Sequence, residues 1–315
     1  MRVPVLSTVA LAALAVLALL PAIAGAGQPA TPPAAGTIAH PAGADEVVLR
    51  IDEISGFVPV EYVLRLMPSF TLYGDGRAIV QGAITMIYPG PALPNLRQVR
   101  LTEEGVQAVL AEARAAGLLD GDRALANAMV TDLPTTVFIA TAGDRTSTVS
   151  VYGLGIAEDQ LPATARAERR ALQAFQGRLF DLAGRLPADA IAEADQSYAI
   201  DCLQVISQPM PADAATPTAD GDTPRAVLDW PLAGSLATAG EPPIAIRYPI
   251  EGARCFVAEG PEAERLVMAL APANALTLWR SGNGVFAVYP RPLLPDESGC
   301  GAEATGTPAA TPAGA

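Results

Sequence analysis

The chain has 315 residues, with 33 acidic and 20 basic side chains and a formal net charge of −13. Phosphate backbones and anionic membrane surfaces repel such an acidic protein, so nucleic acid is excluded as a partner class. The sequence contains no lysine, which also excludes Schiff-base chemistry, a P-loop and a Ser-Lys dyad.

Residues 1–26 have the order of a secretory signal peptide. Arg2 precedes an apolar run at residues 5–20, and small residues then offer cleavage sites after Ala24 or Ala26. Cleavage removes one positive charge and leaves −14. We expect an exported protein with no transmembrane helix and no lipid anchor in its mature chain; an uncleaved N-terminal anchor is the less favoured alternative.

Three stretches of low-complexity composition predict disorder, because they contain too few large apolar residues to offset chain entropy. They are residues 27–44, 209–225 and 302–315. The material between them predicts an α+β domain at residues 45–208 and a smaller one at residues 226–301. A strand at residues 198–206 suits either block, and two domains or one domain with an insertion both fit the length.

The first block reads as strands, a helix, more strands and a second helix. Strands are expected at residues 47–51, 62–66 and 84–88, with hairpins at residues 70–80 and 135–152. Thr102 is a natural N-cap for a helix that ends near Gly117. A second helix is expected at residues 163–186. This order favours antiparallel sheets with helices packed on one face.

The second block repeats the scheme on a smaller scale. A strand is expected at residues 254–258, followed by a helix that starts at Pro261 and ends before Pro272. A hairpin with an Asn283-Gly284 turn joins strands at residues 276–280 and 285–289.

An exported protein meets an oxidising environment, so its three cysteines suggest one disulfide. Pairing Cys255 with Cys300 would close a loop of about 45 residues and tie down the end of the fold. Cys202 is then expected to be a buried free thiol in an apolar strand. A Cys202–Cys255 bridge remains the competing arrangement.

Several motifs resemble a family of uncharacterised secreted proteins of GC-rich bacteria. They are Phe70-Thr71-Leu72-Tyr73-Gly74-Asp75-Gly76-Arg77, Tyr88-Pro89-Gly90-Pro91-Ala92-Leu93-Pro94, and the ending from Arg291-Pro292-Leu293-Leu294-Pro295-Asp296-Glu297 to Cys300. The resemblance covers most of residues 46–300. It implies secretion and a Cys255–Cys300 pair, and it implies no activity.

Carboxylates are the acid–base groups that remain for catalysis. The only histidine, His40, falls in the stretch expected to be disordered, so His-dependent triads and zinc sites are not expected. Asp52, Glu53 and Glu61 offer a glycosidase-like pair, although solvated strand ends explain them equally well. Asp120-Gly121-Asp122 lacks the later ligands of a calcium loop, and Gly153-Leu154-Gly155 lacks the third glycine of a phosphate loop. No metal or other cofactor is expected.

A contact surface is expected on the last hairpin, where Trp279, Arg280, Tyr289 and Arg291 combine residue types that dominate interfaces. Pro91-Ala92-Leu93-Pro94 has the spacing of a polyproline ligand, but a rigid loop is the simpler interpretation. We expect a non-catalytic protein that binds an unknown protein or cell-envelope ligand, in the envelope or the medium. The alternative is a carboxylate-dependent hydrolase acting on glycans.

Overall fold

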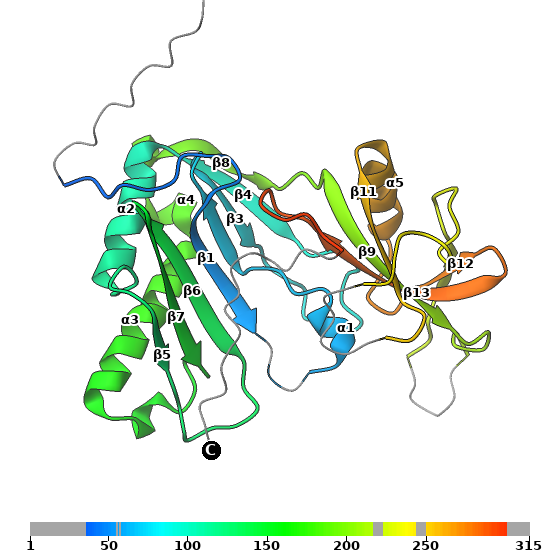
Figure 1. Cartoon of the computed structure of the whole chain (residues 1–315), viewed down its shortest axis with the longest axis horizontal. Helices are drawn as coiled ribbons and strands as arrows, with labels where there is room; N and C mark the ends of the chain where they lie inside the picture. Colours follow the sequence, from blue (N-terminus) through cyan, green and yellow to red (C-terminus); the bar gives the residue numbers. More distant parts are fainter. Residues whose placement is uncertain (1–35, 55, 57, 217–222, 244–249, 301–315) are drawn as a thin grey trace, which may run out of the picture. The chain divides into compact units, whose positions relative to one another are not determined.

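The structure, a computed structural model, describes residues 36–54, 56, 58–216, 223–243 and 250–300. The expected signal peptide, residues 27–35 and the expected tail at residues 302–315 lie outside these ranges. The described residues form two β-sheets with five α-helices (Figure 1). The α+β class expected from the sequence is confirmed.

The first sheet has eight strands in the order β5-β7-β6-β1-β2-β3-β4-β8. All neighbours are antiparallel except β5 and β7. The strands are β1 Val47–Ile54, β2 Phe70–Tyr73, β3 Arg77–Gln81, β4 Leu96–Leu101, β5 Arg123–Leu125, β6 Thr135–Ala142, β7 Arg145–Tyr152 and β8 Ile191–Ser197.

Three helices pack on one face of this sheet (Figure 1): α2 Glu103–Ala115, α3 Ala163–Leu179 and α4 Leu182–Arg185. The Thr102 side chain accepts a hydrogen bond from the Gly105 N–H, which confirms the expected N-cap of α2. Gly117 has φ +78°, the left-handed conformation that ends a helix. The expected second helix is interrupted before Leu182. Its stripe Leu172, Phe175 and Leu179 is buried against the sheet.

A buried ion pair lies where α3 meets the end of β7. Arg169 and Glu158 have side chains only 1% and 7% exposed, and their Nε–Oε1 distance is 3.1 Å. Arg169 also donates to the carbonyls of Tyr152 and Gly153. Glu158 also accepts a hydrogen bond from the Gly155 N–H. The Gly153-Leu154-Gly155 segment is therefore a structural turn that Arg169 and Glu158 connect to α3.

The second sheet has five strands in the order β10-β12-β13-β9-β11, antiparallel except for β10 and β12. They are β9 Cys202–Met210, β10 Val227–Asp229, β11 Arg254–Glu259, β12 Leu278–Ser281 and β13 Gly284–Pro292. Helix α5, Pro261–Leu270, buries Leu266 and Leu270 in a core shared with Val205, Trp279 and Phe286. The strand that suited either block thus belongs to this sheet.

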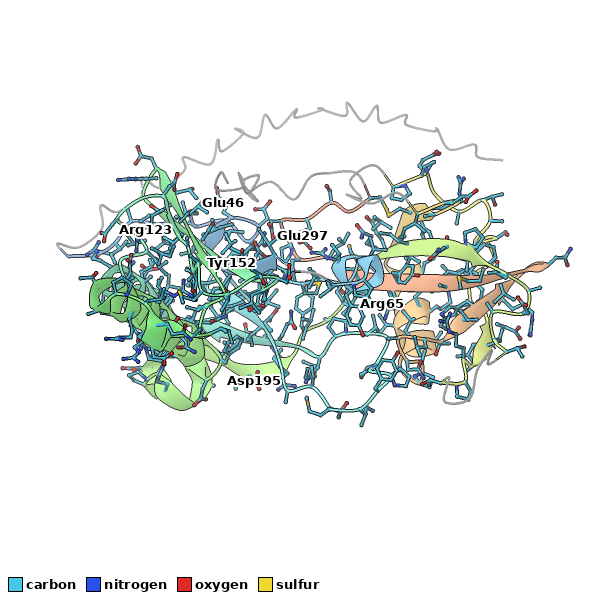
Figure 2. All side chains as sticks on the ribbon, turned by 90° about the horizontal axis from the view of Figure 1, so that it is seen from below. Glu46, Arg65, Arg123, Tyr152, Asp195 and Glu297 are labelled. Carbon is cyan, nitrogen blue, oxygen red and sulfur yellow. A yellow bond between two sulfur atoms is a disulfide. The ribbon has the colours of Figure 1, made fainter. Side chains whose placement is uncertain are left out.

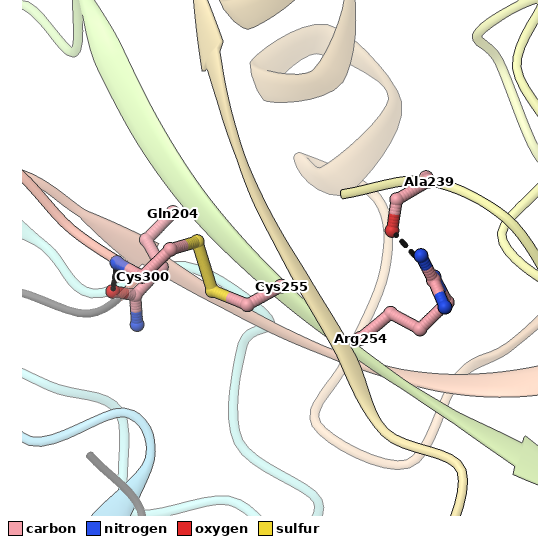
Figure 3. Close-up of a disulfide and its surroundings, with 5 residues drawn as sticks. All are labelled: Gln204, Ala239, Arg254, Cys255 and Cys300. Carbon is pink, nitrogen blue, oxygen red and sulfur yellow. Dashed lines mark hydrogen bonds between the residues drawn. A yellow bond between two sulfur atoms is a disulfide. The ribbon is translucent and has the colours of Figure 1, made fainter. Parts of the chain in front are cut away.

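The chain leaves β13 and continues over the helix-free face of the first sheet. We call residues 293–300 the strap. Leu294 of the strap is buried with Met67, Tyr73, Ile79 and Leu96. A disulfide joins Cys300 to Cys255 of β11, and the Cys300 N–H donates to Gln204 of β9 (Figure 3). The expected pairing is confirmed, and Cys202 is free and partly exposed rather than buried.

Two expected strands are wrong. Val60–Val63 is a short helix, α1, in which i→i+3 bonds such as Tyr62 N–H to Pro59 O replace ladder bonds. Residues 84–88 pair with no described strand: the chain leaves the sheet at Gly82, whose N–H bonds to Asn95 O. Alternation predicts a half-buried strand only where a partner strand is available.

Two of the stretches expected to be disordered are partly ordered. Ile38 is buried beside α2, where its N–H and C=O exchange hydrogen bonds of 2.8 Å with the Gln107 amide. His40 is also held, with Nδ1 2.6 Å from Pro41 O and Nε2 3.2 Å from Glu103 Oε1. Pro209 and Met210 extend β9 and pair with Phe286 and Val285. The composition of these stretches did not predict their order, because the contacts that order them come from residues distant in the sequence.

Candidate functional site

Charged and phenolic side chains gather where the strap crosses the first sheet. Arg50 and Asp52 are two positions apart on β1, so both project from the face opposite Leu49 and Ile51. Tyr73 of β2 lies on the same face, and Asp296 and Glu297 come from the strap. Figure 2 labels Glu297. We call these residues, together with Arg291, the strap cluster.

Asp296 is held by both strands beneath it. Its Oδ1 lies 2.6 Å from Arg50 Nη2 and accepts a hydrogen bond of 2.7 Å from the Tyr73 hydroxyl. The Arg50 side chain is 7% exposed and the Asp296 side chain 14%. Arg50 Nε also donates to Thr71 Oγ1. The pair is therefore largely removed from water.

Glu297 makes a two-pronged pair with Arg291, in which Nη1–Oε2 and Nη2–Oε1 measure 2.8 and 2.6 Å. Its Oε2 also accepts from the Leu294 N–H, and Arg291 Nε donates to Leu66 O. Planar forks of this kind are strong and directional. The Arg291–Glu297 pair fixes the conformation of the strap and ties β13 to the segment before β2.

The electrostatics of the cluster act unequally on its members. Burial raises the pKa of Asp52 to about 6, and Glu297 and Asp296 add to this, while Arg50 and Arg291 oppose it. Burial and Asp296 together raise the pKa of Tyr73, so the phenol stays protonated. Burial alone would lower the pKa of Arg50, but the hydrogen bond and charge of Asp296 raise it overall.

The cluster joins the two sheets. Asp296 and Glu297 already accept hydrogen bonds from arginine, tyrosine or backbone donors. Of the carboxylates expected to form a catalytic pair, only Asp52 belongs to the cluster. Glu53 is exposed on β1, and the Glu61 side chain lies outside the described residues. Where the structure describes the chain, no group of His, Cys, Asp and Glu residues is placed to hold a metal ion.

The expected contact surface on the last hairpin is not one exposed patch. Trp279 is 2% exposed and packs edge-on against Trp230, with ring centroids 5.7 Å apart. Tyr289 is 5% exposed and belongs to a separate core cluster with Cys255. Arg291 pairs with Glu297 in the strap cluster. Only Arg280 is solvent-exposed, and it pairs with Asp229 at 3.1 Å.

The Asp120-Gly121-Asp122 segment connects the end of α2 to β5. Asp122 Oδ1 accepts from the Thr148 N–H, and Arg123 donates to Gly117 O while pairing with Glu168 of α3. An open depression of about 420 Å³ lies beside this segment, at the end of α2. Asp122, Arg123 and Glu168 beside it are engaged in contacts within the protein.

The most exposed apolar feature among the described residues is the loop between β3 and β4. Ile84, Met86, Ile87 and Tyr88 are 69, 94, 64 and 71% exposed. We call residues 84–88 the tip. Hydrophobic surface this concentrated on one short segment differs from the single exposed apolar residues of ordinary surfaces.

Both ends of this loop are fixed. At one end, Gly82 N–H bonds to Asn95 O, and the Asn95 amide donates to Ala83 O. At the other end, Ala275 N–H bonds to Gly90 O and Ala92 N–H to Ala273 O. Ala92 is buried in the core of the second sheet. The Pro91-Ala92-Leu93-Pro94 segment is thus an ordered part of the fold, and the tip is carried between two anchored ends.

Comparisons with protein-family models, curated proteins and solved structures found no match to this chain. Among the described residues, no helix is both long enough and apolar enough to cross a bilayer.

Proposed function

We propose that this is an exported, non-catalytic protein that binds a component of the cell envelope through the tip at residues 84–88. Four exposed, large apolar side chains on one short loop carry the proposal. Removing a large apolar side chain fully from water stabilises a complex by about 1.5–3 kcal/mol. The tip therefore offers enough surface for reversible binding even after the costs of association.

The anchored loop ends support the same conclusion. A mobile loop must be ordered when it binds, and that ordering opposes binding. Hydrogen bonds fix the loop at Gly82 and again at Gly90 and Ala92. The two ends of the loop are therefore already ordered before contact, so less conformational entropy is lost than for a loop with free ends.

Export is proposed from the order of Arg2, the apolar run and the small residues that follow it. The Cys255–Cys300 disulfide is compatible with an oxidising compartment. N-terminal sequencing of the protein recovered outside the cytoplasm should find a start close to residue 25 or 27. A mature protein that begins at Met1 would contradict export by cleavage.

The binding proposal is tested by fractionation of a bacterial host that exports the full chain. We expect the wild-type protein to sediment with the envelope, and Ile84→Ser/Met86→Ser/Ile87→Ser/Tyr88→Ser to shift several-fold toward the soluble fraction. The matched control is Met129→Ser/Ile156→Ser/Phe180→Ser/Met268→Ser, which removes four exposed apolar side chains from other elements. A wholly soluble wild type, or equal shifts in both variants, would contradict the proposal.

One observation favours the alternative of a carboxylate-dependent hydrolase. Asp52, with a pKa raised to about 6, has the property of a general acid near neutral pH. Against this role, Asp296 and Glu297 beside it already accept hydrogen bonds from partners within the fold. Turnover of a polysaccharide or of peptidoglycan that disappears in Asp52→Asn, with folding retained, would favour the hydrolase over the binding protein.

A further inference from the structure

The loop that carries the tip contains no charged side chain. Residues 81–95 contain no Asp, Glu, Lys, Arg or His, whereas charged residues make up 17% of the chain. The charged residues that flank it in the sequence, Arg77 and Arg97, pair with Asp75 and Asp195. The segment that presents the tip is therefore itself uncharged, although the protein as a whole is strongly acidic.

The size of the tip helps to identify what contacts it. A stable interface between proteins buries about 800 Å² on each partner and uses about 20–30 residues from each side. The tip has five residues, and the loop on either side of them returns to the fold at Gly82 and Gly90. A lipid surface needs no such footprint, because it adapts to any shape and accepts apolar side chains one by one.

We propose that the tip inserts into the interfacial layer of a lipid surface with neutral headgroups. This rests on the proposed function and names its ligand. Ile84, Met86 and Ile87 supply apolar side chains, and Tyr88 is of the type that gathers at the boundary between headgroups and acyl chains. Because the mature chain carries −14, anionic headgroups would repel it and neutral ones would not.

The contact is peripheral. A membrane-spanning helix needs about 20 apolar residues, and the tip is a quarter of that length. Binding by a few side chains of one loop is reversible, and it leaves the two sheets and the strap outside the bilayer.

The test is sedimentation of the mature full chain with phosphatidylcholine vesicles. We expect the bound fraction to fall at least tenfold in Ile84→Ser/Met86→Ser/Ile87→Ser/Tyr88→Ser. It should be unchanged in the control Met129→Ser/Ile156→Ser/Phe180→Ser/Met268→Ser. Phosphatidylglycerol added to the vesicles should weaken binding at low salt, and high salt should restore it. Equal binding by the two quadruple variants, or no binding by the wild type, would overturn the inference.

Two further results separate this inference from the proposed function. If vesicles fail to bind while envelope retention still depends on the tip, the ligand is not lipid and the binding function stands. If sedimentation velocity shows a dimer that only the tip variant abolishes, the tip contacts a second copy and the lipid inference is overturned. If neither retention nor vesicle binding depends on the tip, both proposals fail.

Discussion

Arg50 of β1 and Asp296 of the strap form an ion pair of 2.6 Å although 246 residues separate them in the chain. The contact holds the end of the second sheet's last strand against the helix-free face of the first sheet. Both side chains are largely buried. If one partner is removed, the charge of the other stays buried without full solvation by water, which destabilises the fold.

Asp296→Asn should therefore destabilise the fold by about 3–5 kcal/mol, because it removes the carboxylate that the buried Arg50 cation contacts directly. Urea unfolding at neutral pH measures the loss. The matched control is Asp229→Asn, which breaks the Arg280–Asp229 pair, whose side chains are 57 and 83% exposed. That variant should cost less than about 1 kcal/mol. Equal effects of the two substitutions would show that burial of the strap pair has no energetic role.

Asp52 gives the strap cluster a specific pH dependence. Its pKa is about 6 in the folded chain against an ordinary 3.8, so the folded state holds the extra proton between those values. Ionisation of Asp52 thus lowers stability as the pH rises from about 4 to about 6.

Asp52→Asn, which keeps the site neutral, should be more stable than the wild type by about 2–3 kcal/mol at pH 7.5. The advantage should disappear below about pH 4. Urea unfolding at both pH values checks the difference. A constant advantage for Asp52→Asn at both pH values would contradict the assignment.

The disulfide and the free thiol should respond differently to substitution. Cys300→Ser opens a loop of 45 residues and should lower the free energy of unfolding by about 4 kcal/mol under oxidising conditions. Cys202→Ser should leave it nearly unchanged, because Cys202 is unpaired and partly exposed. A reductant should lower the free energy of unfolding of the wild type to a value close to that of Cys300→Ser. Equal stability of wild type and Cys300→Ser without reductant would refute a stabilising role.

The Arg169–Glu158 pair is a second buried ion pair, on the face of the first sheet that the helices cover, opposite the Arg50–Asp296 pair. Glu158→Gln should cost about 3–5 kcal/mol, since Arg169 would keep its charge with only carbonyl partners. The exposed Arg97–Asp195 pair supplies the control: Asp195→Asn should cost under about 1 kcal/mol. Thermal unfolding of the two variants gives the comparison, and similar melting temperatures would speak against the prediction.

The sequence was sufficient to predict the features whose conformation depends on neighbouring residues. Thr102 and Gly117 bound α2, as capping chemistry requires. The hairpins across Gly74-Asp75-Gly76 and Gly143-Asp144 form where positive-φ turn residues separate alternating strands. The positions of the cysteines in the sequence also favour the Cys255–Cys300 bridge that the structure contains. Each of these features depends on residues close in sequence or on the scarcity of alternatives.

Features that depend on distant partners were missed or misread. Strand β8 is polar and exposed along most of its length, and it forms because β4 offers an open edge. Trp279 and Tyr289 have the composition of an interface, yet they fill two different cores. Residue type alone does not distinguish an aromatic side chain in a core from one on a surface.

The sequence by itself determined the fold class and most helix and hairpin boundaries, because capping, turn chemistry and side-chain periodicity act over a few residues; it favoured the Cys255–Cys300 disulfide over Cys202–Cys255 without deciding between them. Only the tertiary structure decided that Asp52, Arg291 and Asp296 meet in one cluster, and that Ile84–Tyr88 stay in water. Burial and pairing are properties of contacts between segments far apart in the chain. Local sequence patterns do not predict those contacts, because they form only when the sheets assemble.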